Sequence, residues 1–268
     1  MSARAALALT QASWRTAKSY RFSFVLSFVS LAVTIVPVYF VANALQQFMA
    51  PVISSEGRDY FGFVLIGTAM LTLVSAALSS FASAVSGGLS SGFFEALLVT
   101  PTSLGSLLAG QTGYAFAWAA ARAILLVGAG AFLGVDLHWL RLPEAMLVTT
   151  VLVCAYGGVG LIAAALVVSF RTNAAIPQGV LLVSTLLGGV YFPTSVLPPV
   201  AAPVAEWLPL TPGLRALRRA LLLGYPLSAI NGDLLQLVGL ALSSVVVGAV
   251  SLRFAFRYAK NAGSLSQY

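Results

Sequence analysis

Long runs without charged residues dominate this sequence. A helix needs about 20 apolar residues to cross a bilayer, and six runs reach or approach that length. They cover residues 22–45, 60–85, 104–134, 145–170, 174–192 and 234–252. The third run alone contains a charge, Arg122. The pattern predicts an all-α integral membrane protein with six transmembrane helices, forming one domain over residues 1–268.

Composition supports a lipid environment. Of the 268 residues, 59% are hydrophobic and 8% are charged, with a mean hydropathy of +0.96. A soluble domain carries about 25% charged residues. The single cysteine, Cys154, excludes an intrachain disulfide, and with the single histidine, His138, it gives no reason to expect a metal site.

The distribution of Lys and Arg predicts the orientation of the chain. With six spans, both termini lie on one side of the membrane. That side holds eight basic residues: Arg4, Arg15, Lys18, Arg21, Arg171, Arg253, Arg257 and Lys260. The opposite loops hold five, namely Arg58, Arg141, Arg215, Arg218 and Arg219, together with six acidic residues. The positive-inside rule therefore places both termini in the cytoplasm, with the protein in the cell's cytoplasmic (inner) membrane.

The segment before the first span is basic and amphipathic. Apolar residues such as Leu7, Leu9 and Trp14 alternate with Arg4, Arg15 and similar polar residues in 4–20. This pattern favours an interfacial helix that lies among the lipid head groups. A polar tail without regular structure is the alternative.

The connection between spans two and three is unusual for a cytoplasmic loop. Apolar residues recur at helical spacing in 91–101, and Glu95 is its sole charge. Because a short helix has no core of its own, its apolar face must lie against the membrane or bind a partner protein. The sequence leaves both possibilities open.

The segment between spans five and six, 193–233, is rich in proline yet too apolar for an exposed loop. Seven prolines break it into helices that are too short to cross a bilayer. We therefore expect a re-entrant hairpin in the outer leaflet, buried against other spans. The spacing of Arg215, Arg218 and Arg219 predicts that they share one helical face.

The sequence lacks recognisable catalytic chemistry. It contains no G-x-x-x-x-G-K-[ST] nucleotide-binding loop and no Ser/His/Asp or paired-carboxylate arrangement above chance. We expect no cofactor, no nucleic-acid partner and no catalytic residue. Arg122 stands out because a charge within a span costs about 2.5–3.5 kcal/mol on insertion scales. It either lines a conduit or contacts an anionic head group, or else the span starts late, near Tyr114, and Arg122 snorkels or pairs structurally with a neighbouring helix.

Glycines at close spacing predict where helices touch. Gly130 and Gly134 in the third span, and Gly157, Gly158 and Gly160 in the fourth, allow backbones to approach. Packing is the favoured interpretation of both sets.

Two stretches resemble the permeases of ABC-2-type exporters. Residues 92–101, GFFEALLVTP, are similar to a G-T-x-E-x-L-x-x-T-P pattern that follows span two in that family. Residues 188–193, GGVYFP, with the later LPLTP at 208–212, resemble the family's span-five end and outer hairpin. Phe93 and Ala96 depart from the small hydroxyl and basic residues that are usual there.

The resemblance implies partners and site residues. It implies two permease copies, identical or related, with two nucleotide-binding ATPase subunits that supply ATP and Mg²⁺. A coupling helix would enter the ATPase through Gly92, Phe93, Phe94, Glu95, Leu97, Leu98, Thr100 and Pro101. The path or its gate would include Arg122, Tyr191, Phe192, Pro193, Arg215, Arg218 and Arg219. The cargo would be amphipathic, lipid-linked or a glycan.

Two other functions compete with an exporter permease. A self-contained channel or ion-coupled carrier would favour ionisable residues within its spans, where this chain has Arg122 alone. A membrane enzyme that modifies lipid would need clustered His, Asp or Glu near an interface. Co-purification with an ATPase subunit would distinguish the exporter from both.

Overall fold

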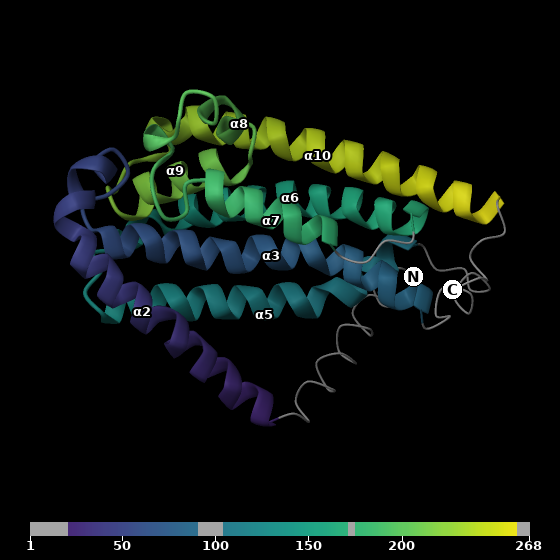
Figure 1. Ribbon diagram of the computed structural model, residues 1–268, viewed down its shortest axis with the longest axis horizontal. Coiled ribbons are helices and arrows are strands. Elements are labelled where there is room, and N and C mark those ends of the chain that lie inside the picture. Colours follow the sequence, from purple (N-terminus) through teal and green to yellow (C-terminus); the bar gives the residue numbers. More distant parts are fainter. Residues whose placement is uncertain (1–20, 91–103, 171–174, 262–268) are drawn as a thin grey trace.

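The computed structural model describes residues 21–90, 104–170 and 175–261, and every regular element in these ranges is helical (Figure 1). The long helices are α2 (Arg21–Ile53), α3 (Tyr60–Ser90), α5 (Leu104–Phe132), α6 (Leu142–Phe170) and α10 (Leu227–Asn261). The shorter ones are η1 (Trp139–Arg141), α7 (Ala175–Leu187), η2 (Thr194–Val196), α8 (Ala202–Glu206) and α9 (Leu210–Leu221). The predicted interfacial helix (4–20) and coupling helix (91–101) lie outside the described residues.

Five helices in the described ranges are long and apolar enough to cross a membrane. Their spanning segments are Ser30–Ile53, Tyr60–Gly87, Thr112–Phe132, Trp139–Phe170 and Leu227–Tyr258. These match five of the six predicted spans. The fifth predicted span, 174–192, is a shorter helix: α7 has 13 residues, or about 20 Å at 1.5 Å per residue, against a hydrocarbon core of about 30 Å.

The helix α7 ends early because of a glycine pair. Gly189 has a φ of +80°, a conformation that residues with a Cβ rarely adopt. A Cβ added at Gly188 would lie 2.3 Å from the Ser184 carbonyl oxygen and 2.9 Å from the side chain of Leu210. The chain therefore leaves the helix at Leu187 and enters the proline-rich segment. The sequence-based expectation of a helix to residue 192 was wrong by five residues.

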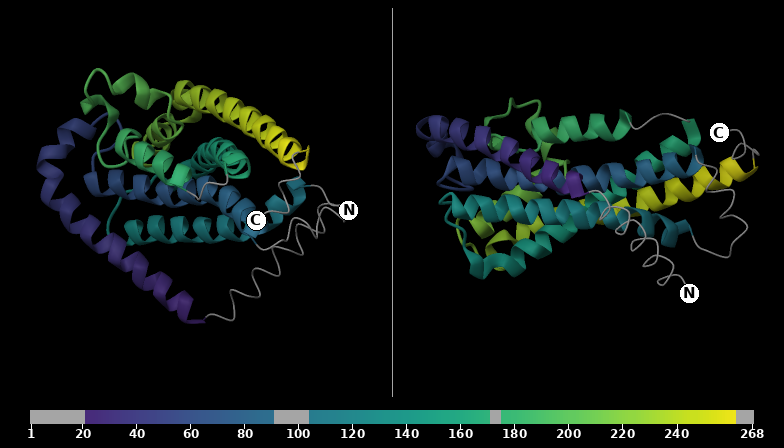
Figure 2. Two further views of the ribbon diagram at one scale, coloured as in Figure 1. Left: turned by 45° about the vertical axis from the view of Figure 1, so that its right-hand side comes forward. Right: turned by 90° about the horizontal axis from the view of Figure 1, so that it is seen from below.

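The helix α3 is the centre of the bundle. It contacts α2, α5, α6, α7 and α9, while α10 packs along α6. Figure 1 shows α3, α5, α6, α7 and α10 running side by side, and α2 diverging from them toward its N-terminal end. In the right-hand view of Figure 2, α2 and α7 lie along the same side of α3.

Close backbone contacts confirm the packing role predicted for the glycines of α6. A Cβ added at Gly158 would lie 2.5 Å from backbone atoms of Ser244 and Val245 on α10. A Cβ at Gly160 would lie 2.6 Å from the carbonyl oxygen of Ala77 on α3. Gly158 and Gly160 thus let α6 pack between two neighbours. Gly134 differs from the prediction, because it has a φ of +96° in a turn and no atom within 4 Å of the Cβ position.

Candidate translocation groove and its outer anchor

Arg218 is a charged side chain at the end of the bundle where α9 lies. It lies on α9 and is 1% exposed. Its Nη1 donates to Glu56 Oε2 at 3.0 Å and to the Gly189 carbonyl at 2.8 Å. Its Nη2 donates to the Val190 carbonyl at 2.9 Å, and Nε and Nη2 both donate to the Phe63 carbonyl. Arg218 thus joins the α2–α3 loop, α3, the end of α7 and α9.

The surroundings of Arg218 compensate its charge. The guanidinium carbon lies 3.3 Å from the centroid of the Phe63 ring, a cation–π contact. Burial lowers the pKa of Arg218 to about 10, and the carboxylate of Glu56 opposes that effect. The side chain therefore stays charged at neutral pH, and Glu56 is its counter-ion.

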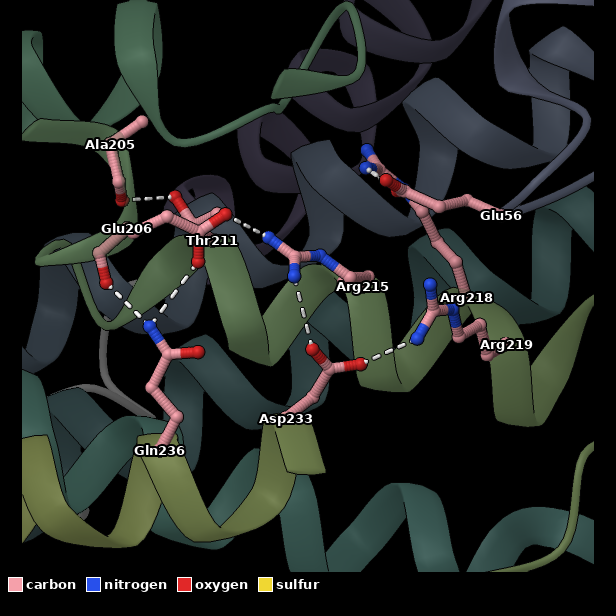
Figure 3. Close-up of polar contacts among 9 residues, drawn as sticks. All are labelled: Glu56, Ala205, Glu206, Thr211, Arg215, Arg218, Arg219, Asp233 and Gln236. Atoms are coloured by element: carbon pink, nitrogen blue, oxygen red, sulfur yellow. Dashed lines mark hydrogen bonds and ion pairs between the residues drawn. The ribbon is translucent and has the colours of Figure 1, made fainter. Parts of the chain in front are cut away.

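A second ionic network lies beside the Arg218–Glu56 ion pair (Figure 3). Arg215 binds Glu206 on α8 and, at 3.2 Å, Asp233 on α10. Arg219 binds the other oxygen of Asp233 at 2.9 Å. Desolvation acts to lower the pKa of Arg215, but the hydrogen bond with Glu206 and the charges of Asp233 and Glu206 outweigh it, so the pKa is raised. Gln236 donates to Glu206 from α10 at 2.8 Å.

The three arginines of α9 project from one side of the helix, as their spacing predicts, but they meet different carboxylates. Arg218 and Arg219 are adjacent residues and point about 100° apart around a helix. Arg218 faces Glu56, whereas Arg215 and Arg219 face Asp233. Each guanidinium has a carboxylate partner within the chain, so α9 is not a free basic patch.

The other predicted gate residues lie in the turn between α7 and η2. The carbonyl of Tyr191 accepts a hydrogen bond from the Tyr60 hydroxyl at 2.8 Å. Phe192 is half-buried, and Pro193 is buried next to η2. The hydrogen bond from Tyr60 holds this turn against the first residue of α3. The predicted docking residues 92–101 fall outside the described residues.

A cavity of about 570 Å³ runs along α3, α5 and α7 and contains Arg122. On α5, Tyr114, Trp118 and Arg122 follow one another at four-residue spacing, which places them on one helical face. The rings of Tyr114 and Trp118 stack with centroids 6.5 Å apart and planes 11° from parallel. We call this cavity the α3/α5/α7 groove.

Hydroxyl groups line the α3 side of the groove. They belong to Thr68, Thr72, Ser75 and Ser79, again on one face of the helix. Thr68 and Ser79 each donate to the carbonyl four residues earlier, at 2.8 and 2.6 Å. Their donors are satisfied within α3, so each oxygen keeps acceptor capacity toward the groove. Thr72 likewise donates to the Ala69 carbonyl at 2.7 Å, so this wall is polar while three of its hydroxyl donors are bound within α3.

Arg122 lies in the middle of its span and reaches across to α2. Its Nη2 donates to the Ser30 hydroxyl at 3.1 Å. Within the described ranges, Arg122 forms no ion pair. The intramembrane arginine thus has a neutral neighbour and faces the groove.

Arg218 and Val190 lie at the Thr68 end of the groove. Gly67 precedes Thr68 on α3, and a Cβ there would lie 2.7 Å from the Val190 carbonyl oxygen and 3.0 Å from Arg218 Nη2. The turn after α7 and the Arg218 side chain therefore press directly on α3 where the groove ends.

The sequence patterns did not identify several residues of the site. Glu56, Glu206 and Asp233 looked like ordinary loop charges, because their partners are distant along the chain. The hydroxyl face of α3 carried a readable signal, since Thr68, Thr72, Ser75 and Ser79 recur with the period of one helical face.

Comparison with protein families decides the identity of this helical bundle. The family model described as ABC-2 type transporter matches residues 5–222, which are 218 of the 268 residues. The chain belongs to the ABC-2 type transporter family. A search among curated proteins gave no match.

Membership in the ABC-2 family accounts for the general character of the molecule. It is a multi-pass membrane protein of a family of transport subunits, and permeases of this family work with an ATP-binding subunit. The match includes α2, α3, α5, α6, α7 and α9. It therefore contains every element that forms the α3/α5/α7 groove and the Arg218–Glu56 contact.

Proposed function

We propose that this chain is the permease subunit of an ATP-driven exporter, and that the α3/α5/α7 groove is its part of the translocation path. The observation that carries the proposal is the groove itself. It places an intramembrane arginine, two aromatic rings and a line of hydroxyls around one cavity in the bundle. A purely structural bundle has no need of an arginine at the middle of a span.

In this proposal the outer segment is the gate. The short helix α7 belongs to a sixth pass, and 193–233 form a re-entrant hairpin that follows it. The ionic contacts of Arg215, Arg218 and Arg219 hold the hairpin against α3 and α10. Opening requires these contacts to shift together, because all three arginines project from the single rigid helix α9.

The driving force enters from the cytoplasmic side. Residues 91–101 form the coupling helix that binds a nucleotide-binding subunit, and ATP binding and hydrolysis there move α3 and α5. A second copy of the chain, or a related permease, completes the path. Both termini lie in the cytoplasm, in accord with the excess of basic residues there.

A pull-down from native membranes tests this function. We expect an ATPase subunit to co-purify with the wild-type chain, and Glu95→Arg to abolish both its binding and the stimulation of its ATPase activity. Asp136→Arg is the matched control, because it makes the same charge change at an exposed residue of the α5–α6 connection. If Glu95→Arg leaves association and stimulation intact, the coupling assignment is wrong. If the purified chain transports cargo alone, the exporter function is wrong.

A further inference from the structure

Arg122 differs from four arginines on or near α9. Arg141, Arg215, Arg218 and Arg219 each form an ion pair with a carboxylate. Within the part of the chain that the structure describes, Arg122 has a hydrogen bond to the neutral Ser30 hydroxyl and no ion pair. Its charge is therefore not compensated by these residues.

The position of Arg122 makes this charge costly. It is ten residues from Phe132, the last residue of α5, or about 15 Å along the helix. That distance equals about half of the hydrocarbon core. An arginine at this depth usually faces a protein interior or an aqueous cavity and pairs with an acidic or polar group.

The rest of the groove offers Arg122 no acidic partner. The lining residues are hydroxyl-bearing, aromatic or apolar, and Arg122 is the charged one among them. Leu71, Ala115, Ala119 and Leu181 supply apolar surface beside the hydroxyls of α3. The groove therefore combines one positive charge with a wall suited to an apolar body.

We infer that the groove takes an amphiphile with a single anionic group, a carboxylate or a phosphate, which becomes the counter-ion of Arg122. This inference rests on the proposed function and adds the class of cargo to it. A guanidinium donates two parallel hydrogen bonds to either anionic group. The apolar part of the cargo lies against Trp118 and the apolar wall, and neutral hydroxyl groups of the cargo face the acceptors of α3. A cationic amphiphile is repelled at this site.

Fluorescence of Trp118 reports on binding without any ATPase. The full chain is reconstituted in phosphatidylcholine nanodiscs with Trp14, Trp139 and Trp207 replaced by phenylalanine, so that Trp118 is the remaining tryptophan. Brominated C18 chains that carry a phosphate, a carboxylate, an alcohol or a trimethylammonium group are added at pH 8.5, because bromine quenches tryptophan on contact. The phosphate and carboxylate probes distinguish the two anionic groups.

We expect both anionic probes to quench Trp118 saturably, at about tenfold lower concentration than the alcohol, since hydrogen bonds to a charged group favour binding by about that factor or more. Arg122→Gln removes the preference, Arg122→Lys keeps a smaller one, and Arg58→Gln, at an exposed loop residue, leaves it unchanged. Equal quenching by alcohol and anions in the wild type would overturn the inference, as would a preference that survives in Arg122→Gln.

The two proposals fail separately. Loss of ATPase coupling with intact anion-selective quenching contradicts the exporter function alone. Unselective quenching in a chain that still binds and stimulates its ATPase contradicts the cargo class alone. Should Arg122→Gln not fold, the series of probes on the wild type and the Arg122→Lys variant still decides the question.

Discussion

Arg218 donates to Glu56 across 162 residues of sequence, with 3.0 Å between Nη1 and Oε2, and both side chains are buried. The contact joins α9 to the loop between α2 and α3 in the part of the molecule where the groove ends. Breaking a buried ion pair at one partner leaves the other charge without compensation.

Arg218→Met is therefore expected to lower the free energy of unfolding by about 3–5 kcal/mol, because Glu56 remains buried and unpaired. Glu56→Gln in the same chain should recover part of that loss. Equilibrium unfolding in mixed micelles measures all four members of this double-mutant cycle. Additive effects of the two substitutions would contradict the coupling, and Arg58→Met serves as an exposed control.

Gly158→Ala is expected to destabilise the packing of α6 on α10. Its Cβ would lie 2.5 Å from the backbone of Ser244 and Val245, so the helices must separate, at a cost of about 1–3 kcal/mol. Gly239→Ala on α10 is the matched control, because no atom lies within 4 Å of its Cβ position. Thermal aggregation followed by size-exclusion chromatography compares the two. The expectation fails if both variants are as stable as the wild type.

Ser75→Trp is expected to fill the α3/α5/α7 groove at the middle of its hydroxyl wall. Tryptophan adds a large rigid surface where serine leaves space. Stimulation of ATP hydrolysis by cargo should fall to the basal level, while the ATPase subunit still co-purifies. Ser243→Trp places the same side chain on the exposed face of α10 and should leave stimulation unchanged. Normal stimulation in Ser75→Trp would remove the groove from the path.

Cysteine labelling tests the orientation that the basic residues predict. In a Cys154→Ser background, Ser195→Cys in η2 should react with a membrane-impermeant maleimide in intact cells, because this exposed residue faces outward in the proposed topology. Arg257→Cys, near the other end of the bundle, should react after the membrane is permeabilised. The reverse pattern would invert the topology.

Hydrophobic run length predicted most of the fold. Five predicted spans correspond to helices that can cross a membrane, since twenty apolar residues without charges have few other stable environments. The run at 174–192 was misjudged because length and polarity do not register backbone conformation. Gly188 and Gly189 are as apolar as their neighbours, yet they end the helix α7.

The site was predicted in part, for a related reason. The sequence shows that Arg122 costs free energy on membrane insertion, because that cost depends on the apolar residues next to it along the chain. The partners of Arg215, Arg218 and Arg219 are not visible, because Glu56, Glu206 and Asp233 come from three separate elements. Spacing along α9 gives the direction of each arginine but not the acid that meets it.

The location of these acids constrains how the protein is made. Glu56 is synthesised long before α9, and Asp233 shortly after it. A nascent chain that ends at Arg219 therefore contains Glu56 but lacks Asp233, the other buried carboxylate that pairs with α9. Until Asp233 emerges, Arg215 and Arg219 lack that neutralising neighbour. Stable placement of α9 is therefore expected to await Asp233 near the start of α10, and truncation before Asp233 should expose this region to quality-control proteases.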